Sequence, residues 1–201
     1  LESLTVDDIG VTAAVENGQY TFTMPARAVA VTATFEQVTP YDLWIGGTQV
    51  TSHNAADVFG DGKVSYDPTS NALTLNNYTY EGAGHTWEEA GWGDTPIHYG
   101  AAIYYSGTET LNLVLKGDSS VTHTGSADMS VSYGLYAKGN VVVSEGSAGG
   151  SLAVTGDTSG GDSYGVYANG SITVSGSLTA TGGTAEYSSC GVYLPDYSGS
   201  I

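Results

Sequence analysis

The sequence predicts an all-β protein, in which a small β module precedes a right-handed parallel β-helix. Three observations support this class. Short alternating apolar stretches are separated by glycine-rich turns, no stretch has helical periodicity, and one motif recurs with Gly134, Gly165 and Gly191 spaced 31 and 26 residues apart. In a solenoid, each segment pairs with its equivalent in the next coil. An antiparallel β-sandwich also has short strands at regular spacing, and it remains the alternative.

Residues 1–38 read as a partial β module. An Asn-Gly turn at 17–18 precedes an alternating strand at 20–23, a Met-Pro-Ala corner at 24–26 and a second strand at 29–35. The stretch "VENGQYTFTMPARAVAVTATFE" resembles the closing half of the internalin-B-type B repeat of Gram-positive surface proteins. The resemblance implies a stalk or spacer module.

Residues 41–201 follow Pro40 and form the predicted β-helix domain. We expect a strand at 41–45 that ends in the Gly46-Gly47 turn, and a hairpin whose strands, 63–66 and 72–75, are joined by the turn at 67–71. The glycine-rich repeats come after this entry hairpin.

Three kinds of segment recur in this domain. The tyrosine motif occurs as YGLYA, YGVYA and CGVYL, and more weakly as AIYYSG, at residues 133–137, 164–168, 190–194 and 102–107. Thirteen residues separate Val121 from Gly134, Leu152 from Gly165 and Leu178 from Gly191, so the sequence aligns these three positions. Apolar stretches at 111–115, 141–143 and 172–174 supply the third segment, and residues 145–149 read as an insertion in a surface turn.

The entry segment and the repeats at 133–137, 164–168 and 171–176 resemble the repeat-containing "carbohydrate-binding domain" of cell-surface proteins of gut Firmicutes type. This resemblance implies an extracellular, cell-surface or cell-wall location and an adhesin or fibre role. It also implies that a signal peptide and an anchor lie outside this stretch.

The composition restricts the partners. With 4 Lys and Arg against 21 Asp and Glu, the formal net charge is -17, which argues against nucleic acid and anionic membranes. No run is long enough for a transmembrane helix. Cys190 is the single cysteine, so no intrachain disulfide can form, and we expect it to be a small core residue.

The segment at 81–98, "EGAGHTWEEAGWGDTPIH", departs from the repeat pattern and is predicted to be a loop insertion. Aromatic rings beside carboxylates and imidazoles are typical of sugar-binding sites. The candidate ligand-binding residues here are Trp87, Trp92, Glu88, Glu89, Asp94, His85 and His98. Alternatively, the two tryptophans cap the open end of the first coil. Trp44, in an alternating strand, is expected in the core.

One tyrosine recurs at the same place in each motif, and the four are Tyr104, Tyr136, Tyr167 and Tyr193. If the residues before them point inward, these rings form an outward strip along which an extended glycan could lie. If the rings point inward, they form a core stack, which is the arrangement that we favour.

The sequence predicts neither a catalytic site nor a metal site. A polysaccharide lyase needs a cation and a base, yet the only cations after residue 40 are Lys63, Lys116 and Lys138. A hydrolase needs paired carboxylates, and the adjacent Glu88 and Glu89 point opposite ways on an extended segment.

Acidic residues in glycine-rich turns could bind Ca²⁺, although solvated turn residues are the preferred interpretation. They are Asp57, Asp61, Asp118, Asp157 and Asp162. We therefore expect a non-catalytic surface segment without a cofactor that binds a polysaccharide or host glycan, or else a purely structural stalk.

Overall fold

The structure is a computed structural model that describes residues 3–6, 9–10, 14–16, 19–21, 26–35, 37–91, 95–125 and 129–195. These residues form strands, turns and irregular segments, and none of them is helical. Accordingly, this part of the chain has no helix long and apolar enough to cross a membrane. The chain divides into two compact units, Leu1–Val38 and Thr39–Ile201.

The described residues of the first unit form five short strands. β1 (Ser3–Val6) pairs antiparallel with both β2 (Ile9–Gly10) and β5 (Val31–Thr34), and β3 (Ala14–Glu16) pairs antiparallel with β4 (Gln19–Thr21). β4 and β5 overlap the strands expected at 20–23 and 29–35. The predicted Asn-Gly turn and most of the Met-Pro-Ala corner lie outside the described residues.

Two hairpins open the second unit. β6 (Pro40–Ile45) and β7 (Thr48–Thr51) flank the Gly46-Gly47 turn, in which both glycines have positive φ, 55° and 79°. β8 (Val64–Asp67) pairs antiparallel with β9 (Ala72–Asn76) across the turn before Asn71. The predicted strand before Gly46-Gly47 and the predicted hairpin are confirmed, and β7, which pairs with β6, was not predicted.

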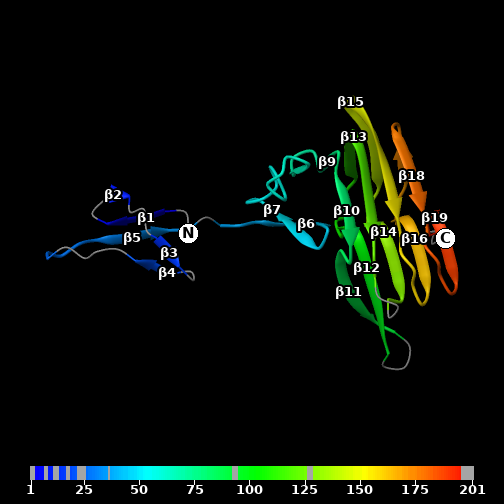
Figure 1. The fold of residues 1–201 in the computed structure, drawn as a ribbon, viewed down its shortest axis with the longest axis horizontal. Helices are drawn as coiled ribbons and strands as arrows, with labels where there is room; N and C mark the ends of the chain where they lie inside the picture. Colours follow the sequence, from blue (N-terminus) through cyan, green and yellow to red (C-terminus); the bar gives the residue numbers. More distant parts are fainter. Residues whose placement is uncertain are drawn as a thin grey trace, which may run out of the picture. The chain divides into compact units, whose positions relative to one another are not determined.

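One seven-stranded sheet of this unit carries the tyrosine motifs (Figure 1). Its parallel strands lie side by side in the order β12 (Pro96–Tyr105), β14 (Val131–Ala137), β16 (Asp162–Ala168) and β19 (Ser188–Tyr193). On the other side of β12, β6 pairs antiparallel and is followed by β7, while β11 (His85–Ala90) also pairs antiparallel with β12. The sheet is therefore mixed.

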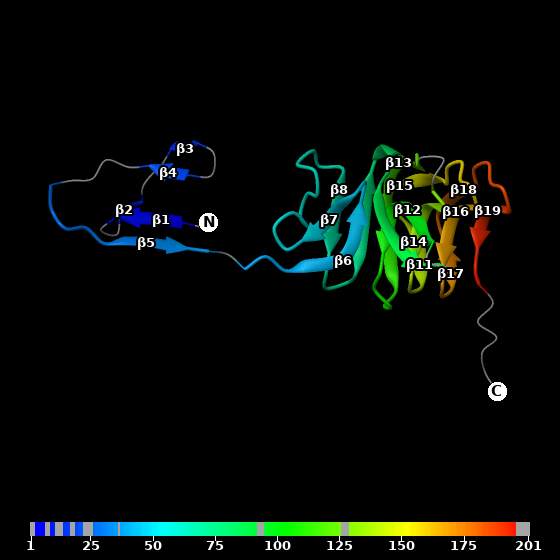
Figure 2. The same cartoon turned by 90° about the horizontal axis from the view of Figure 1, so that it is seen from below.

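The second seven-stranded sheet holds the other segments of each repeat. Its core is β9, β13 (Leu111–His123), β15 (Val141–Thr155) and β17 (Ile172–Val174), paired in parallel in that order, with β8 antiparallel at the β9 edge. β10 (Thr79–Gly82) pairs in parallel with β13, and β18 (Ser177–Thr181) pairs in parallel with β15. Successive repeats thus lie beside one another, as the colours show in Figure 2.

The motif glycines Gly134, Gly165 and Gly191 lie next to one another in successive repeats, at a place where the neighbouring backbones approach closely. A Cβ added at Gly134 would lie 2.7 Å from the carbonyl oxygen of Gly165, and one added at Gly165 would lie 2.6 Å from that of Gly191. No real Cβ tolerates such a distance to a backbone atom. Glycine is therefore required at these positions by close packing between repeats.

The expected alignment of Val121 with Leu152 and Leu178 is wrong by two residues at Val121. Val121 is opposite Val154 and not Leu152, whereas Leu152 is opposite Leu178 as expected. A shift of two residues keeps every side chain on its predicted face, so the sequence pattern alone could not reveal it. The insertion expected at 145–149 lies in a bulged part of β15 between two correctly paired stretches.

Side chains of both sheets meet in one core. Leu135 and Val166 from the first sheet and Leu113, Val143 and other aliphatic side chains from the second belong to a single buried cluster. The described protein is thus all-β, with mixed sheets and parallel pairing of the repeats. Parallel pairing is incompatible with the antiparallel sandwich for these repeats, and neither sheet closes on itself.

Candidate ligand-binding sites

The recurrent tyrosines lie on the outer face of the first sheet and not in the main core. Leu135 and Val166 are fully buried in that core, whereas Tyr136 and Tyr167, which follow them, are half-buried on the opposite face. The expected inward stack is therefore wrong. The interior between the sheets is filled by aliphatic side chains and alanines, and strand alternation turns the rings outward.

These rings form a continuous stack. The ring centroids of Tyr104 and Tyr136 are 5.3 Å apart, those of Tyr136 and Tyr167 are 5.2 Å apart, and those of Tyr167 and Tyr193 are 5.7 Å apart. The interplanar angles are 14°, 9° and 24°. The spacing follows from the distance of about 4.8 Å between paired strands, which places equivalent rings in stacking contact.

A second column, which we did not single out in the sequence, runs beside the first. Tyr133 and Tyr164 are buried, their centroids are 5.7 Å apart, and Tyr133 contacts Tyr136 edge-on at 5.1 Å. Strict alternation would place Tyr133 and Tyr136 on opposite faces. The alternation is interrupted at Gly134, where an added Cβ would point into the core and overlap Val154. Because glycine has no Cβ, it tolerates this irregular position in the strand.

Trp87 completes this surface from the neighbouring strand. It lies opposite Tyr99 in the β11–β12 pair and stacks on that ring at 5.2 Å and on Tyr133 at 6.0 Å. We define the tyrosine face as the outer surface formed by Trp87, Tyr99, Tyr104, Tyr133, Tyr136, Tyr164, Tyr167 and Tyr193. The segment at 81–98 is therefore mostly strand and not a loop, and cross-strand aromatic pairing explains why.

Two residues join the edge of the tyrosine face. The ring of His85 lies 4.7 Å from that of Trp44 and 4.6 Å from that of Tyr104, and burial lowers the pKa of His85. The ring of Trp44 also contacts that of Tyr104, at 5.4 Å. The expectation that Trp44 belongs to the main core is therefore wrong, since its neighbours Leu43 and Ile45 take the inward positions.

The predicted acidic residues separate onto two faces of β11. Glu88 lies on the far side, where its Oε1 is 3.0 Å from Nδ1 of His98. Glu89 shares the face of Trp87. Burial is the largest cause of the raised pKa values of Tyr99 and Tyr104, and the charge of Glu89 raises both further. The predicted residues Trp92 and Asp94 lie outside the described residues.

Two cavities are lined in part by residues of β11 and β12. One of about 400 Å³ lies between the end of β11 and the start of β12 and is lined by Glu88, Glu89, Gly91 and Pro96, among others. Another of about 580 Å³ is lined in part by Tyr99, Asp162 and Tyr187. The structure therefore brings Trp87 and Glu89 to a partly exposed aromatic surface with hollows beside it.

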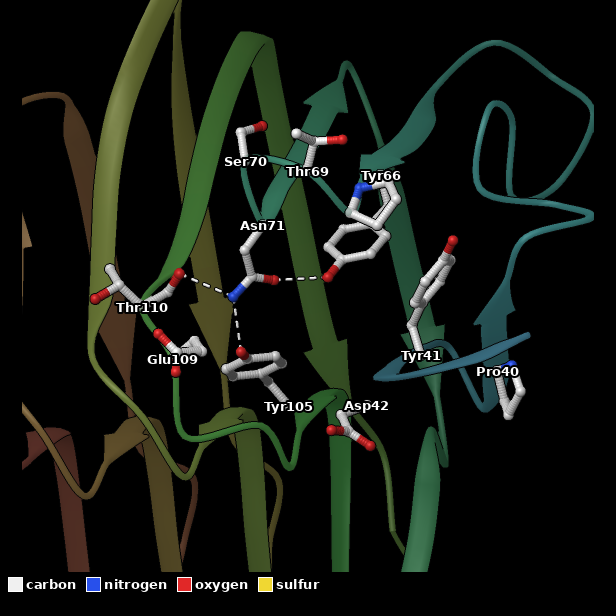
Figure 3. Close-up of a pocket in the computed structure, with 11 residues that line it drawn as sticks. Pro40, Tyr41, Asp42, Tyr66, Thr69, Ser70, Asn71, Tyr105, Glu109 and Thr110 are labelled. Carbon is white, nitrogen blue, oxygen red and sulfur yellow. Dashed lines mark hydrogen bonds between the residues drawn. The ribbon is translucent and has the colours of Figure 1, made fainter.

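A third cavity, of about 500 Å³, was not predicted from the sequence (Figure 3). Its wall is formed by the start of β6, the β8–β9 turn, and the end of β12 with the chain that follows it. The described lining residues include Tyr41, Asp42, Tyr66, Asn71, Tyr105 and Glu109. They come from three separate segments of the sequence, and no single motif contains them, so no sequence signal groups them.

The acidic turn residues proposed for Ca²⁺ accept hydrogen bonds from the protein itself. The carboxylate of Asp57 accepts from the backbone N–H groups of Gly60, Asp61 and Gly62, and that of Asp157 accepts from the N–H of Gly125. Within the described ranges, no group of three or more His, Cys, Asp or Glu side chains is placed to hold a metal ion.

Comparison of the chain with protein-family models, with curated proteins and with solved structures finds no match. The residues themselves must therefore carry any functional argument.

Proposed function

We propose that this chain is a non-catalytic segment of an extracellular, cell-surface protein that binds a glycan at the tyrosine face. The observation that carries the proposal is the continuous, half-exposed aromatic surface headed by Trp87, with the carboxylate of Glu89 beside it. The surface location rests on the sequence resemblances alone. For the fold, the in-register parallel stacking of three segments per repeat supports a right-handed parallel β-helix.

The geometry favours one mode of contact. Within each column the ring faces cover one another, so a sugar lying along the strip meets ring edges and phenol hydroxyls. Burial raises the pKa values of Tyr104 and Tyr136, the latter to about 12, so both hydroxyls stay protonated and can donate hydrogen bonds to sugar oxygens. Ring-face contact is available only at exposed ends such as Tyr193, which is 38% exposed.

The direct test is a titration of tryptophan fluorescence with a panel of neutral and acidic polysaccharides. We expect saturable changes that disappear in Trp87→Ala. The double variant Tyr136→Phe/Tyr167→Phe keeps both rings and removes two hydroxyls, and it should weaken binding by about fivefold to hundredfold if each lost hydrogen bond contributes about 0.5–1.5 kcal/mol. Tyr41→Phe, which removes a hydroxyl away from this face, is the matched control.

A structural stalk is the second candidate, favoured by the stacking itself. Rings that cover one another in a column bury apolar area between repeats and would stabilise a fibre segment without any ligand. If no glycan in the panel changes the fluorescence, while Tyr136→Ala lowers the unfolding free energy, the tyrosine face serves the fold and the binding proposal is wrong.

A further inference from the structure

The cavity of Figure 3 combines aromatic rings with negative charge. The rings of Tyr41 and Tyr66 have centroids 5.3 Å apart and an interplanar angle of 58°, so they form two walls of a corner. Asp42 and Glu109, both exposed, are among the 11 lining residues, and none of those residues carries a positive charge. The cavity is therefore acidic and partly aromatic.

The acidic side chains act on the tyrosines that line the cavity. Burial is the largest cause of the raised pKa of Tyr66, about 12, and Asp42 adds to it. Burial is also the largest cause of the raised pKa of Tyr105, and the charges of Asp42 and Glu109 raise it further. Both carboxylates therefore lie within electrostatic reach of Tyr105, which lines the cavity.

The walls are held in place before any ligand arrives. The hydroxyl of Tyr66 donates to Oδ1 of Asn71 at 2.6 Å, and Nδ2 of Asn71 donates to the hydroxyl of Tyr105 at 2.7 Å and to the carbonyl oxygen of Thr110 at 2.9 Å (Figure 3). Asn71 has a φ of 49°, which fits the tight β8–β9 turn. A preorganised site loses little conformational entropy on binding.

We propose that this cavity binds a small organic ammonium group, of the kind carried by an amino sugar or by a choline-type headgroup. The cation lies against the rings of Tyr41 and Tyr66 and is neutralised by Asp42 and Glu109. Aromatic faces attract weakly hydrated organic cations, and nearby carboxylates strengthen the attraction. A neutral sugar of the same size gains neither contribution. This site is separate from the tyrosine face and does not depend on its function.

The test is a calorimetric titration of the whole chain with choline and with glucosamine, at matched ionic strength. The neutral counterparts 3,3-dimethylbutanol and glucose serve as ligand controls. We expect at least one ammonium probe to bind about tenfold more tightly than its neutral counterpart. In NMR spectra the resonances of the Asn71 side-chain amide should shift on binding, because Asn71 lines the cavity. Which probe binds distinguishes the two sources of the cation.

Variants localise the binding. Asp42→Asn and Glu109→Gln remove charge from exposed side chains and should each raise the Kd roughly threefold to tenfold. Tyr41→Leu removes a ring wall and should do the same, whereas Tyr41→Phe keeps the ring and should lose less affinity than Tyr41→Leu. Glu186→Gln removes the same charge from an exposed site in the last repeat and is the matched control.

Two results would overturn the proposal. One is that neither ammonium probe binds more tightly than its neutral counterpart. The other is that Glu109→Gln and Asp42→Asn bind no more weakly than Glu186→Gln. Binding of neutral glycans that is lost in Trp87→Ala concerns the tyrosine face only, so the two proposals fail independently.

Discussion

His123 carries a fully buried imidazole ring. Its Nδ1 lies 2.8 Å from Oγ of Ser132, which also accepts a hydrogen bond from the N–H of Asp157 at 2.7 Å. Two glycines make room for the ring: a Cβ at Gly100 would overlap Nε2, and one at Gly125 would lie 3.0 Å from Cε1. Burial lowers the pKa of His123, although a bond to a backbone group and the charge of Asp157 act in the opposite direction.

The stability of the second unit should therefore fall as the pH falls below the ordinary histidine pKa of 6.5. The unfolded chain binds a proton on this side chain near that pH, whereas the folded chain binds it only at lower pH, so acid favours unfolding. The loss is at most about 1.4 kcal/mol per pH unit for one group. Urea unfolding at pH 7.5 and pH 5.0 measures it.

The comparison variant is His123→Asn, which cannot titrate in this range. Carboxylates contribute equally to the pH dependence of both proteins, so the wild-type chain should lose more stability than the variant over the same interval. Equal losses would show that His123 does not contribute.

At the scale of the single strand, the motif Tyr-Gly-x-Tyr explains how two aromatic columns share one face. Gly134 and Gly165 allow the strand to place Tyr133 and Tyr136, or Tyr164 and Tyr167, on the same side. The glycine also permits the close approach of the next repeat. One small residue therefore serves both the packing between repeats and the outer surface.

Gly165→Ala should lower the free energy of unfolding by about 2 kcal/mol or more, because the new Cβ would lie 2.5 Å from the backbone nitrogen of Thr181 and 2.6 Å from the carbonyl oxygen of Gly191. Gly60→Ala is the control. Gly60 has a positive φ of 74° but open space around it, so only backbone strain of about 1 kcal/mol is expected. Chemical denaturation compares the two, and an equal effect would exclude the close-approach argument.

At the scale of the whole unit, each repeat contacts only its neighbours, and among the described residues the last repeat is paired on one side only. Val174 and Val192 in this repeat are 45% and 49% exposed, whereas their register partners Val143 and Val166 are each 1% exposed. In a solenoid, stability arises from contacts between adjacent repeats. The end repeat should therefore open more readily than the middle ones.

Hydrogen–deuterium exchange followed by mass spectrometry measures this gradient. We expect peptides from β13, β14 and the first half of β15 to be protected longest, and peptides from β17, β18 and β19 to exchange at least about tenfold faster, since they lack one neighbouring strand. Uniform protection from β12 to β19 would show that the unit opens as a single cooperative block.

Much of the β architecture was predictable because it depends on local patterns. The Gly46-Gly47 pair predicts a turn, and the turn residues that end at Asn71 predict a hairpin. The repeated motifs predict which strands are equivalent, and the strands that contain Gly134 and Gly165 do pair in parallel. The two-residue shift at Val121 was not predictable, since it leaves the pattern of inward and outward residues unchanged. Trp44 was misplaced because alternation specifies that a residue changes face but not which face is inside.

The sequence by itself determined that this protein is built of strands, that its repeats are equivalent and that a tyrosine recurs in each of them. Only the tertiary structure decided that those tyrosines face outward, that Trp87 joins them from another strand, and that Tyr41, Asp42, Tyr66 and Glu109 surround one cavity. The reason is physical: periodicity records interactions between residues near in the chain or equivalent in a repeat. A surface or cavity depends on where distant segments meet, and no local pattern encodes that.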